Sequence, residues 1–213
     1  LFYRDFILGE DPTDVERVIS RIRRMGSFKP WGAAVSAIEV ALWDIAGKAA
    51  GLPVYKLLGG KVRDRVRVYN GGVKVPLEGT SPEHYAESMA AMKELKEGFS
   101  IVKQGISFHS PMAEETPNYF YGELPQGVRP MFGGPMTEQG LKHTIACIEA
   151  MKDALGDEVG LALDCGPGFT VPDALRLAKA VEPLNLMWLE DMITGDYTPY
   201  VLPDLYREVT RAT

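Results

Sequence analysis

The chain has 213 residues, of which 46% are hydrophobic and 24% charged, and its mean hydropathy is −0.09. This is the composition of an ordinary globular protein and excludes a low-complexity chain. The net charge is −6 and no run of five like charges occurs, so we expect no nucleic-acid partner. No apolar stretch approaches the roughly 18 residues of a membrane span, so we expect no membrane partner. The two cysteines are too few for a disulfide framework and suggest a reducing compartment, so we expect a cytoplasmic protein.

Residues 1–62 have the pattern of a helical domain. Helices are expected at 11–26 and 32–50, because apolar residues recur there at helical spacing. Gly51 stands where a left-handed helix cap belongs, and a short helix is expected at 53–58.

Residues 63–213 alternate short apolar strands with amphipathic helices. Strands are expected at 66–70, 101–103, 159–164 and 186–190, and helices at 82–97, 138–155, 172–181 and from about 203. Such alternation predicts βαβ units around a parallel sheet, which makes this part an α/β domain.

Three of these strands end in a charged residue, namely Lys103, Asp164 and Glu190. The carboxyl ends of parallel strands form the ligand-binding face, so two carboxylates on consecutive strands predict a site for a hard cation such as Mg²⁺. A lysine beside them could act as a base, with its pKa lowered by burial and by the cation. The alternatives are that Asp164 caps the next helix, that Glu190 begins a solvated loop and that Lys103 is simply exposed.

Four segments resemble the signature of one enzyme family. Residues 30–48 read PWGAAVSAIEVALWDIAGK, residues 51–60 read GLPVYKLLGG, and the strands at 161–164 and 188–191 end in LALD and WLED. Together they resemble the mandelate racemase/muconate lactonizing enzyme branch of the enolase superfamily. The resemblance implies a (β/α)7β TIM-type barrel of which residues 63–213 are about the first half. It also implies that residues 1–62 are the helical, C-terminal part of an N-terminal capping domain.

The resemblance further implies one Mg²⁺ per active site, held by three carboxylates, and abstraction of the proton α to a substrate carboxylate. Asp164 and Glu190 match the first two metal ligands, and Lys103 matches the first lysine of a Lys-x-Lys motif. The second lysine position is Gly105, and Gly166 stands where relatives often have Asn. Racemisation between two opposed bases is therefore not expected from this half.

A long Gly- and Pro-rich segment, 104–136, leaves the end of a strand and is expected to lie over the active site as a lid. His109 in this segment is a candidate acid for a leaving hydroxyl group; the alternative is an exposed loop histidine. A long insertion here is similar to that of family members that dehydrate acid sugars. Four aromatic residues are candidates to pack the lid: Tyr119, Phe120, Tyr121 and Phe132.

Two further residues are candidates for substrate binding. Trp31 either lines the pocket from the capping domain or is a packed aromatic. Asn70 either reaches a substrate oxygen or forms the turn before two glycines.

The function expected is a Mg²⁺-dependent acid-sugar dehydratase, of the aldonate or uronate type. It would act on a small-molecule carboxylate by α-proton abstraction, enediolate stabilisation and β-elimination of water. The alternatives are a racemase, epimerase or cycloisomerase of the same family, or a non-catalytic truncated member. Relatives are commonly oligomers, so a homo-oligomer is expected.

The number of strands indicates an incomplete barrel. A closed barrel needs eight strands, so we expect an internal stretch of a protein of roughly 400 residues, a length implied by the resemblance. The third metal ligand is then expected beyond Thr213, and these 213 residues alone are expected neither to fold robustly nor to catalyse.

Overall fold

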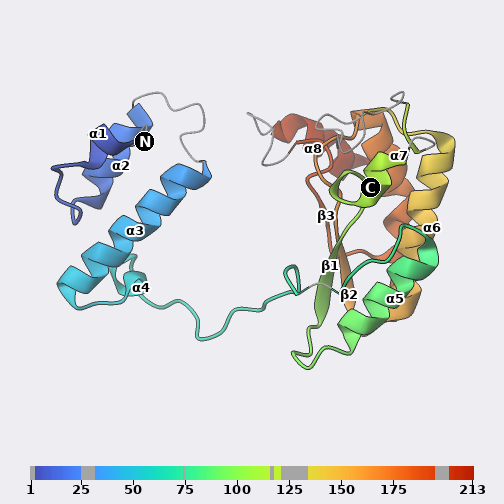
Figure 1. The fold of residues 1–213 in the computed structure, drawn as a ribbon, viewed down its shortest axis with the longest axis horizontal. Helices are drawn as coiled ribbons and strands as arrows, with labels where there is room; N and C mark the ends of the chain where they lie inside the picture. The colour runs from blue at the N-terminus through green and yellow to red at the C-terminus, as the bar shows by residue number, and fades with distance from the viewer. Residues whose placement is uncertain (1–2, 25–31, 74, 116–117, 121–133, 195–201) are drawn as a thin grey trace. The chain divides into compact units, whose positions relative to one another are not determined.

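The computed structural model describes residues 3–24, 32–73, 75–115, 118–120, 134–194 and 202–213. Contacts within the chain divide it into two compact units, Leu1–Val66 and Arg67–Thr213, each with its own hydrophobic core. This division by contacts falls at Val66, and the domain boundary predicted after residue 62 stays a prediction. Figure 1 shows the elements of both units.

The described residues of the first unit form four helices: α1 (Arg4–Ile7), α2 (Val15–Arg24), α3 (Ala33–Ala50) and α4 (Val54–Leu57). The helices predicted from periodicity are thus confirmed, and α1 is additional. One face of α2 packs on α3 through six buried side chains: Val15, Val18, Ile19, Ile22, Val35 and Leu42.

Helix α3 ends as its sequence predicts. Gly51 adopts the left-handed conformation, with φ 67° and ψ 24°, and the amide of Leu52 donates to the carbonyl of Gly47 at 2.9 Å. A Cβ atom at Gly47 would lie 2.8 Å from the Leu52 carbonyl oxygen, so the close approach of the chain requires glycine there.

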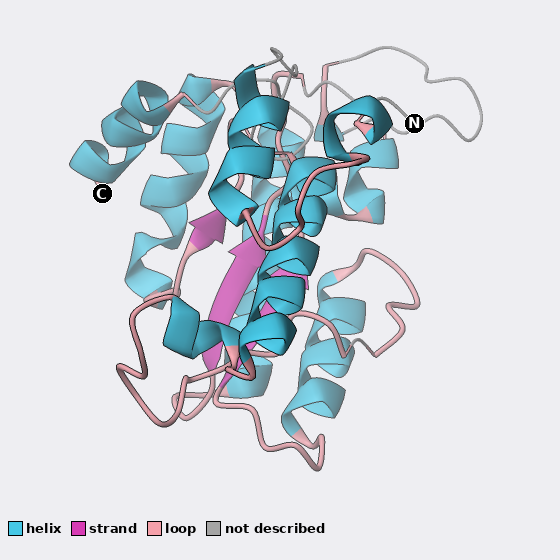
Figure 2. Cartoon of the chain, turned by 90° about the vertical axis from the view of Figure 1, so that its left-hand side faces the viewer, coloured by secondary structure: helices cyan, strands magenta, loops and turns pink. Residues whose placement is uncertain are grey.

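The second unit has a three-stranded parallel sheet of β1 (Ile101–Gly105), β2 (Gly160–Asp164) and β3 (Leu189–Glu190), in that order. Figure 2 shows the strands side by side with their arrowheads in the same direction. The parallel α/β domain predicted from the alternation is therefore confirmed. Its helices are α5 (Pro82–Lys93), α6 (Glu138–Leu155), α7 (Val171–Val181) and α8 (Pro203–Ala212).

The two faces of the sheet differ in character because successive side chains of a strand alternate between faces. Val102, Leu161 and Leu163 are fully buried in the core that also contains side chains of α5, α6 and α7. The alternate positions, which include Lys103 and Asp164, belong to the opposite face. These charged residues therefore gather on the face away from these helices.

The strand predicted at 66–70 is absent. Only Asn70 pairs with its neighbour, in an isolated parallel bridge to Val102. Val66 and Val68 are 71% and 64% exposed, so these two apolar side chains do not pack the segment against the sheet. Alternation of residue types predicted a strand here, but without burial it does not form one.

Other bounds also differ from the prediction, among them the ends of α5 and of β3. The helix expected to reach residue 97 ends at Lys93, where the chain tightens into a turn through the Leu95 amide and the Met92 carbonyl. Strand β3 has two residues rather than five, although the Met187 amide still donates to the Leu161 carbonyl at 2.8 Å.

The described part of segment 104–136 is built into the domain. It continues β1 to Gly105 and then forms two 3₁₀ helices, η1 (Ser107–His109) and η2 (Pro111–Glu114). Tyr119 is buried in the core, whereas Phe120 is 72% exposed. Tyr121 and Phe132 lie outside the described residues, so the lid itself stays a prediction.

None of the helices in the described ranges is long and apolar enough to cross a bilayer.

Candidate active site

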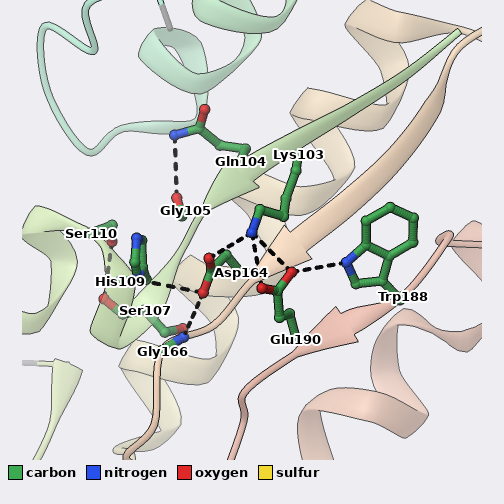
Figure 3. A network of polar contacts seen from close by, with 10 residues as sticks. All are labelled: Lys103, Gln104, Gly105, Ser107, His109, Ser110, Asp164, Gly166, Trp188 and Glu190. Carbon is green, nitrogen blue, oxygen red and sulfur yellow. Dashed lines mark hydrogen bonds and ion pairs between the residues drawn. The ribbon is translucent and has the colours of Figure 1, made fainter. Parts of the chain in front are cut away.

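Asp164 and Glu190 end β2 and β3, and the side chain of Lys103, in the middle of β1, reaches both carboxylates (Figure 3). The prediction that β1 ends at Lys103 is wrong, because the strand runs on to Gly105. The Lys103 ammonium donates to Asp164 Oδ2 at 3.0 Å and to Glu190 Oε1 and Oε2 at 3.0 and 2.9 Å. The sheet register explains this convergence, because Asp164 and Glu190 are paired across β2 and β3. The structure thus brings together the three charged residues selected from the sequence.

This cluster is well shielded from solvent. The side chains of Lys103 and Asp164 are 14% and 12% exposed, and that of Glu190 is 34% exposed. Burial alone lowers the pKa of Lys103, but the hydrogen bonds and negative charges of Glu190 and Asp164 raise that pKa above its ordinary value. The expected lowering of the Lys103 pKa depends on a bound cation as well as on burial, so it stays a prediction.

The donor set fits a hard divalent cation. Mg²⁺ is commonly bound through one or two carboxylates, with water or substrate oxygens completing the coordination. Both carboxylates pair with the same Lys103 ammonium, so their oxygen atoms lie close enough to share one cation. Within the described ranges no group of three His, Cys, Asp or Glu side chains is arranged to hold a metal, so a metal site at these two carboxylates stays a prediction.

His109 lies on the other side of Asp164. Its Nδ1 atom is 3.4 Å from Asp164 Oδ1, and the backbone amide of Gly166 donates to the same oxygen at 3.3 Å. The His109 side chain is 40% exposed and so keeps access to solvent. The fourth predicted catalytic or metal-binding residue therefore joins the cluster, rather than standing apart in a loop.

Two aromatic residues that the sequence did not single out border the cluster. The indole N–H of Trp188 donates to Glu190 Oε2 at 3.2 Å, and Tyr69 meets Trp188 edge to face at 5.0 Å. Trp188 precedes Glu190 by two positions, so strand alternation places both side chains on the same face and could have identified it. No sequence signal connects Tyr69 with the site.

The substrate-binding candidates are not part of this cluster as described. Asn70 is buried, and its side-chain amide donates to the Val73 carbonyl at 2.8 Å and accepts from the Val73 amide at 3.0 Å. This is the turn-forming role that the sequence left open, and contact with substrate stays a prediction. Trp31 lies outside the described residues.

A parallel α/β sheet with carboxylates and a lysine gathered at its carboxyl edge defines the class of barrel enzymes whose active sites lie at that edge. The chain belongs to the mandelate racemase/muconate lactonizing enzyme family of the enolase superfamily. Residues 84–210 match the family model described as "Enolase C-terminal domain-like", and residues 3–59 match "Mandelate racemase / muconate lactonizing enzyme, N-terminal domain". The resemblance and the expected fold class, part of a TIM-type barrel with the helical part of a cap, are confirmed.

Characterised relatives carry dehydratase names. The chain is 29% identical to D-xylonate dehydratase of Haloferax volcanii, over 99% of this chain and 47% of that protein. It is 33% identical to a D-mannonate dehydratase of Caulobacter sp. strain K31, over 89% of this chain and 47% of that protein. A solved structure of a mandelate racemase/muconate lactonizing enzyme-like protein from Rubrobacter xylanophilus superposes with a TM-score of 0.71 at 31% identity, covering all of this chain and 53% of that one. The chain thus spans about half the length of the relatives it matches.

Proposed function

We propose that this chain is part of a Mg²⁺-dependent dehydratase of acid sugars. The observation that supports the proposal most directly is the convergence of Asp164 and Glu190 on the Lys103 ammonium, with His109 beside Asp164. The dehydratase names of the relatives support the same reaction class.

In the proposed reaction Lys103, as the base, takes the proton from the carbon next to the substrate carboxylate. The hydroxyl group on the following carbon takes a proton from His109 and leaves as water. The enol product then becomes a 2-keto-3-deoxy acid, so one water leaves for each sugar acid consumed. Mg²⁺, when bound by Asp164 and Glu190, would supply positive charge for the negative charge that collects on the substrate carboxylate. Lys103, which lies beside both carboxylates, is the candidate base, and a cation bound there would lower its pKa toward that role.

We assign to His109 the protonation of the departing hydroxyl group. Its imidazole lies on the Asp164 side of the cluster and is partly open to water, from which it can recover a proton after each turnover. Gly105 supplies no side chain at the neighbouring position of β1, which argues against a racemase that uses a second lysine there.

The experiment is a screen of aldonates and uronates with Mg²⁺, using protein expressed from the complete reading frame. Formation of a 2-keto-3-deoxy acid is expected for at least one substrate, and Asp164→Asn is expected to abolish it. Asp157→Asn, at an exposed position, is the matched control. Exchange of the α-proton with solvent without loss of water, or isomerisation instead of dehydration, would favour the racemase, epimerase or cycloisomerase alternative. An Asp164→Asn enzyme with normal turnover would contradict the assignment of the metal ligand.

The cytoplasmic location and the homo-oligomeric state also remain proposals. Size-exclusion chromatography with light scattering on the same preparation tests the second, and a monomer at working concentration would contradict it.

A further inference from the structure

The helix η1 holds His109 against the ends of two strands. The turn at 106–110, which contains η1, begins where the Ile106 amide donates to the Asp164 carbonyl at 2.9 Å. It closes where the His109 amide donates to the Ile106 carbonyl at 3.0 Å. The chain therefore folds back over the ends of β1 and β2, and Figure 3 shows the imidazole beside Asp164.

Two glycines leave the space that this turn occupies. A Cβ atom at Gly105 would collide with the carbonyl oxygen of His109 and lie 3.0 Å from its Cδ2 atom. A Cβ atom at Gly166 would lie 2.7 Å from the His109 amide nitrogen and 2.8 Å from the Phe108 carbonyl carbon. These are mainly backbone atoms, which cannot rotate away as a flexible side chain can.

The turn is also held from its outer side. The Phe108 ring packs against Tyr119 at 4.6 Å and against Phe169, edge to face, at 5.1 Å. The Ser110 hydroxyl donates to the Ser107 carbonyl at 3.0 Å. With its outer side packed, the turn has no room to move away from a side chain added beneath it.

We propose that Gly105 and Gly166 are positioning residues that allow the 106–110 turn to hold the His109 imidazole at Asp164. Gly105 is the register partner of Asp164 and shares a face of β1 with Lys103, so a side chain there would enter the site. A side chain at position 105 or 166 and the present position of His109 exclude each other. The polar side chain next to Asp164 on this side of the site is thus His109 from the turn, and not a residue at position 105 or 166. The catalytic part of this inference rests on the proposed function, whereas the placement of His109 does not.

The test uses Gly105→Ala and Gly166→Ala in protein expressed from the complete reading frame. Gly72→Ala is the control for added bulk, because a Cβ there meets nothing within 4 Å. Gly98→Ala is the control for left-handed backbone. Gly98 has φ +61°, close to the φ of +65° at Gly166, but a Cβ at Gly98 would meet nothing within 4 Å. His109→Asn identifies the His109 signals.

The first measurement is the Hε1–Cε1 NMR resonance of the His109 ring, assigned by its loss in His109→Asn. We expect it to shift in both test variants and to stay unchanged in both controls. An unchanged resonance in folded Gly105→Ala or Gly166→Ala would overturn the placement. This readout needs no substrate, so it decides the inference even if no acid sugar is turned over.

The second measurement compares solvent deuterium exchange at the α-carbon with formation of the dehydrated product. If His109 protonates the leaving hydroxyl, displacing it should lower product formation about 100-fold while exchange is retained, as in His109→Asn. A general loss of structure would lower both rates together. Equal dehydration in the test and control variants would overturn the catalytic part.

If Gly105→Ala and Gly166→Ala both fail to fold while the two control variants fold, the result supports the need for space under the turn. Phe108→Leu, which removes one aromatic contact on the outer side, then decides whether the turn controls His109. A shifted His109 resonance in that variant supports the inference, and an unshifted one overturns it.

Discussion

Asp164 and Glu190 are register partners on adjacent parallel strands, and both carboxylates bind the single ammonium of Lys103. Two carboxylates held this close repel each other, and burial increases the energetic cost of their charges. A cation between them offsets both effects. The strand pairing therefore creates a cation-binding point by placing two consecutive strand ends at the same level.

Removing either carboxylate should weaken Mg²⁺ binding. We expect Asp164→Asn and Glu190→Gln to raise the dissociation constant for Mg²⁺ by roughly 100-fold or more, since loss of a group that only hydrogen-bonds a metal ligand already costs about 10–100-fold. Isothermal titration calorimetry on protein from the complete reading frame measures this. Asp157→Asn is the control, and equal affinity in all three variants would rule out the site.

Lys103→Met should destabilise the protein mainly when Mg²⁺ is withheld. The change leaves two shielded carboxylates without their cation, and breaking such a buried pair costs about 3 kcal/mol or more. Urea unfolding with and without Mg²⁺ measures the difference, and Mg²⁺ is expected to restore part of the loss. Lys142→Met is the control, because Lys142 is 76% exposed and pairs with Glu138 only at 3.9 Å. Similar losses in the two variants would contradict the prediction.

The variant Trp188→Phe should show whether Trp188 orients the Glu190 carboxylate or only packs against Tyr69. The variant keeps an aromatic ring beside Tyr69 but loses the N–H that donates to Glu190 Oε2. We expect the Mg²⁺ affinity to fall about tenfold, while the free energy of unfolding falls by only about 1 kcal/mol. Calorimetry and urea unfolding check the two values, with Trp43→Phe in α3 as the control. Loss of stability without loss of affinity would assign Trp188 a packing role only.

Features controlled by neighbouring residues in the sequence could be predicted. Helix α6 begins at Glu138 because the Thr137 hydroxyl accepts from the Gly140 amide, and α3 ends at a left-handed Gly51. The carboxylates were predictable for a similar reason, since Asp164 and Glu190 each end a short apolar run. Parallel strands then bring such ends to one edge.

Features controlled by distant contacts could not be predicted. His109 reaches Asp164 only because the turn at 106–110 fits over Gly105 and Gly166, and Gly166 lies on another strand-to-helix connection. The segment 66–70 has the alternation of a strand, yet whether it pairs depends on burial that the sequence does not encode locally.

The two cysteines should be inert in the folded protein. Burial, followed by the nearby charges of Glu115 and Glu83, raises the pKa of Cys147 to about 12. Burial also raises the pKa of Cys165, and the Asp164 charge adds to the effect. Because the thiolate is the reactive form, both thiols stay protonated at pH 8. We expect no labelling by iodoacetamide at that pH until denaturant is added, as read by peptide mass spectrometry. Labelling of either residue in the native protein would show that its surroundings open.

Ser107 combines two unfavourable features within the turn that carries His109. Its backbone has φ 52°, in the left-handed region, and its fully buried hydroxyl has no hydrogen-bond partner among the described residues. Left-handed backbone at a non-glycine residue and an unpaired buried hydroxyl each cost about 1 kcal/mol or more.

Ser107→Gly should therefore raise the free energy of unfolding by about 1 kcal/mol, while Ser107→Ala, which keeps the strained backbone, should raise it less. Urea unfolding of both variants measures the difference, and equal stabilities would exclude backbone strain as the cause. If the strained turn serves to hold His109 at Asp164, the more stable glycine variant should dehydrate its substrate more slowly. Strain retained next to an active-site residue is expected where a less strained turn would place that residue less accurately.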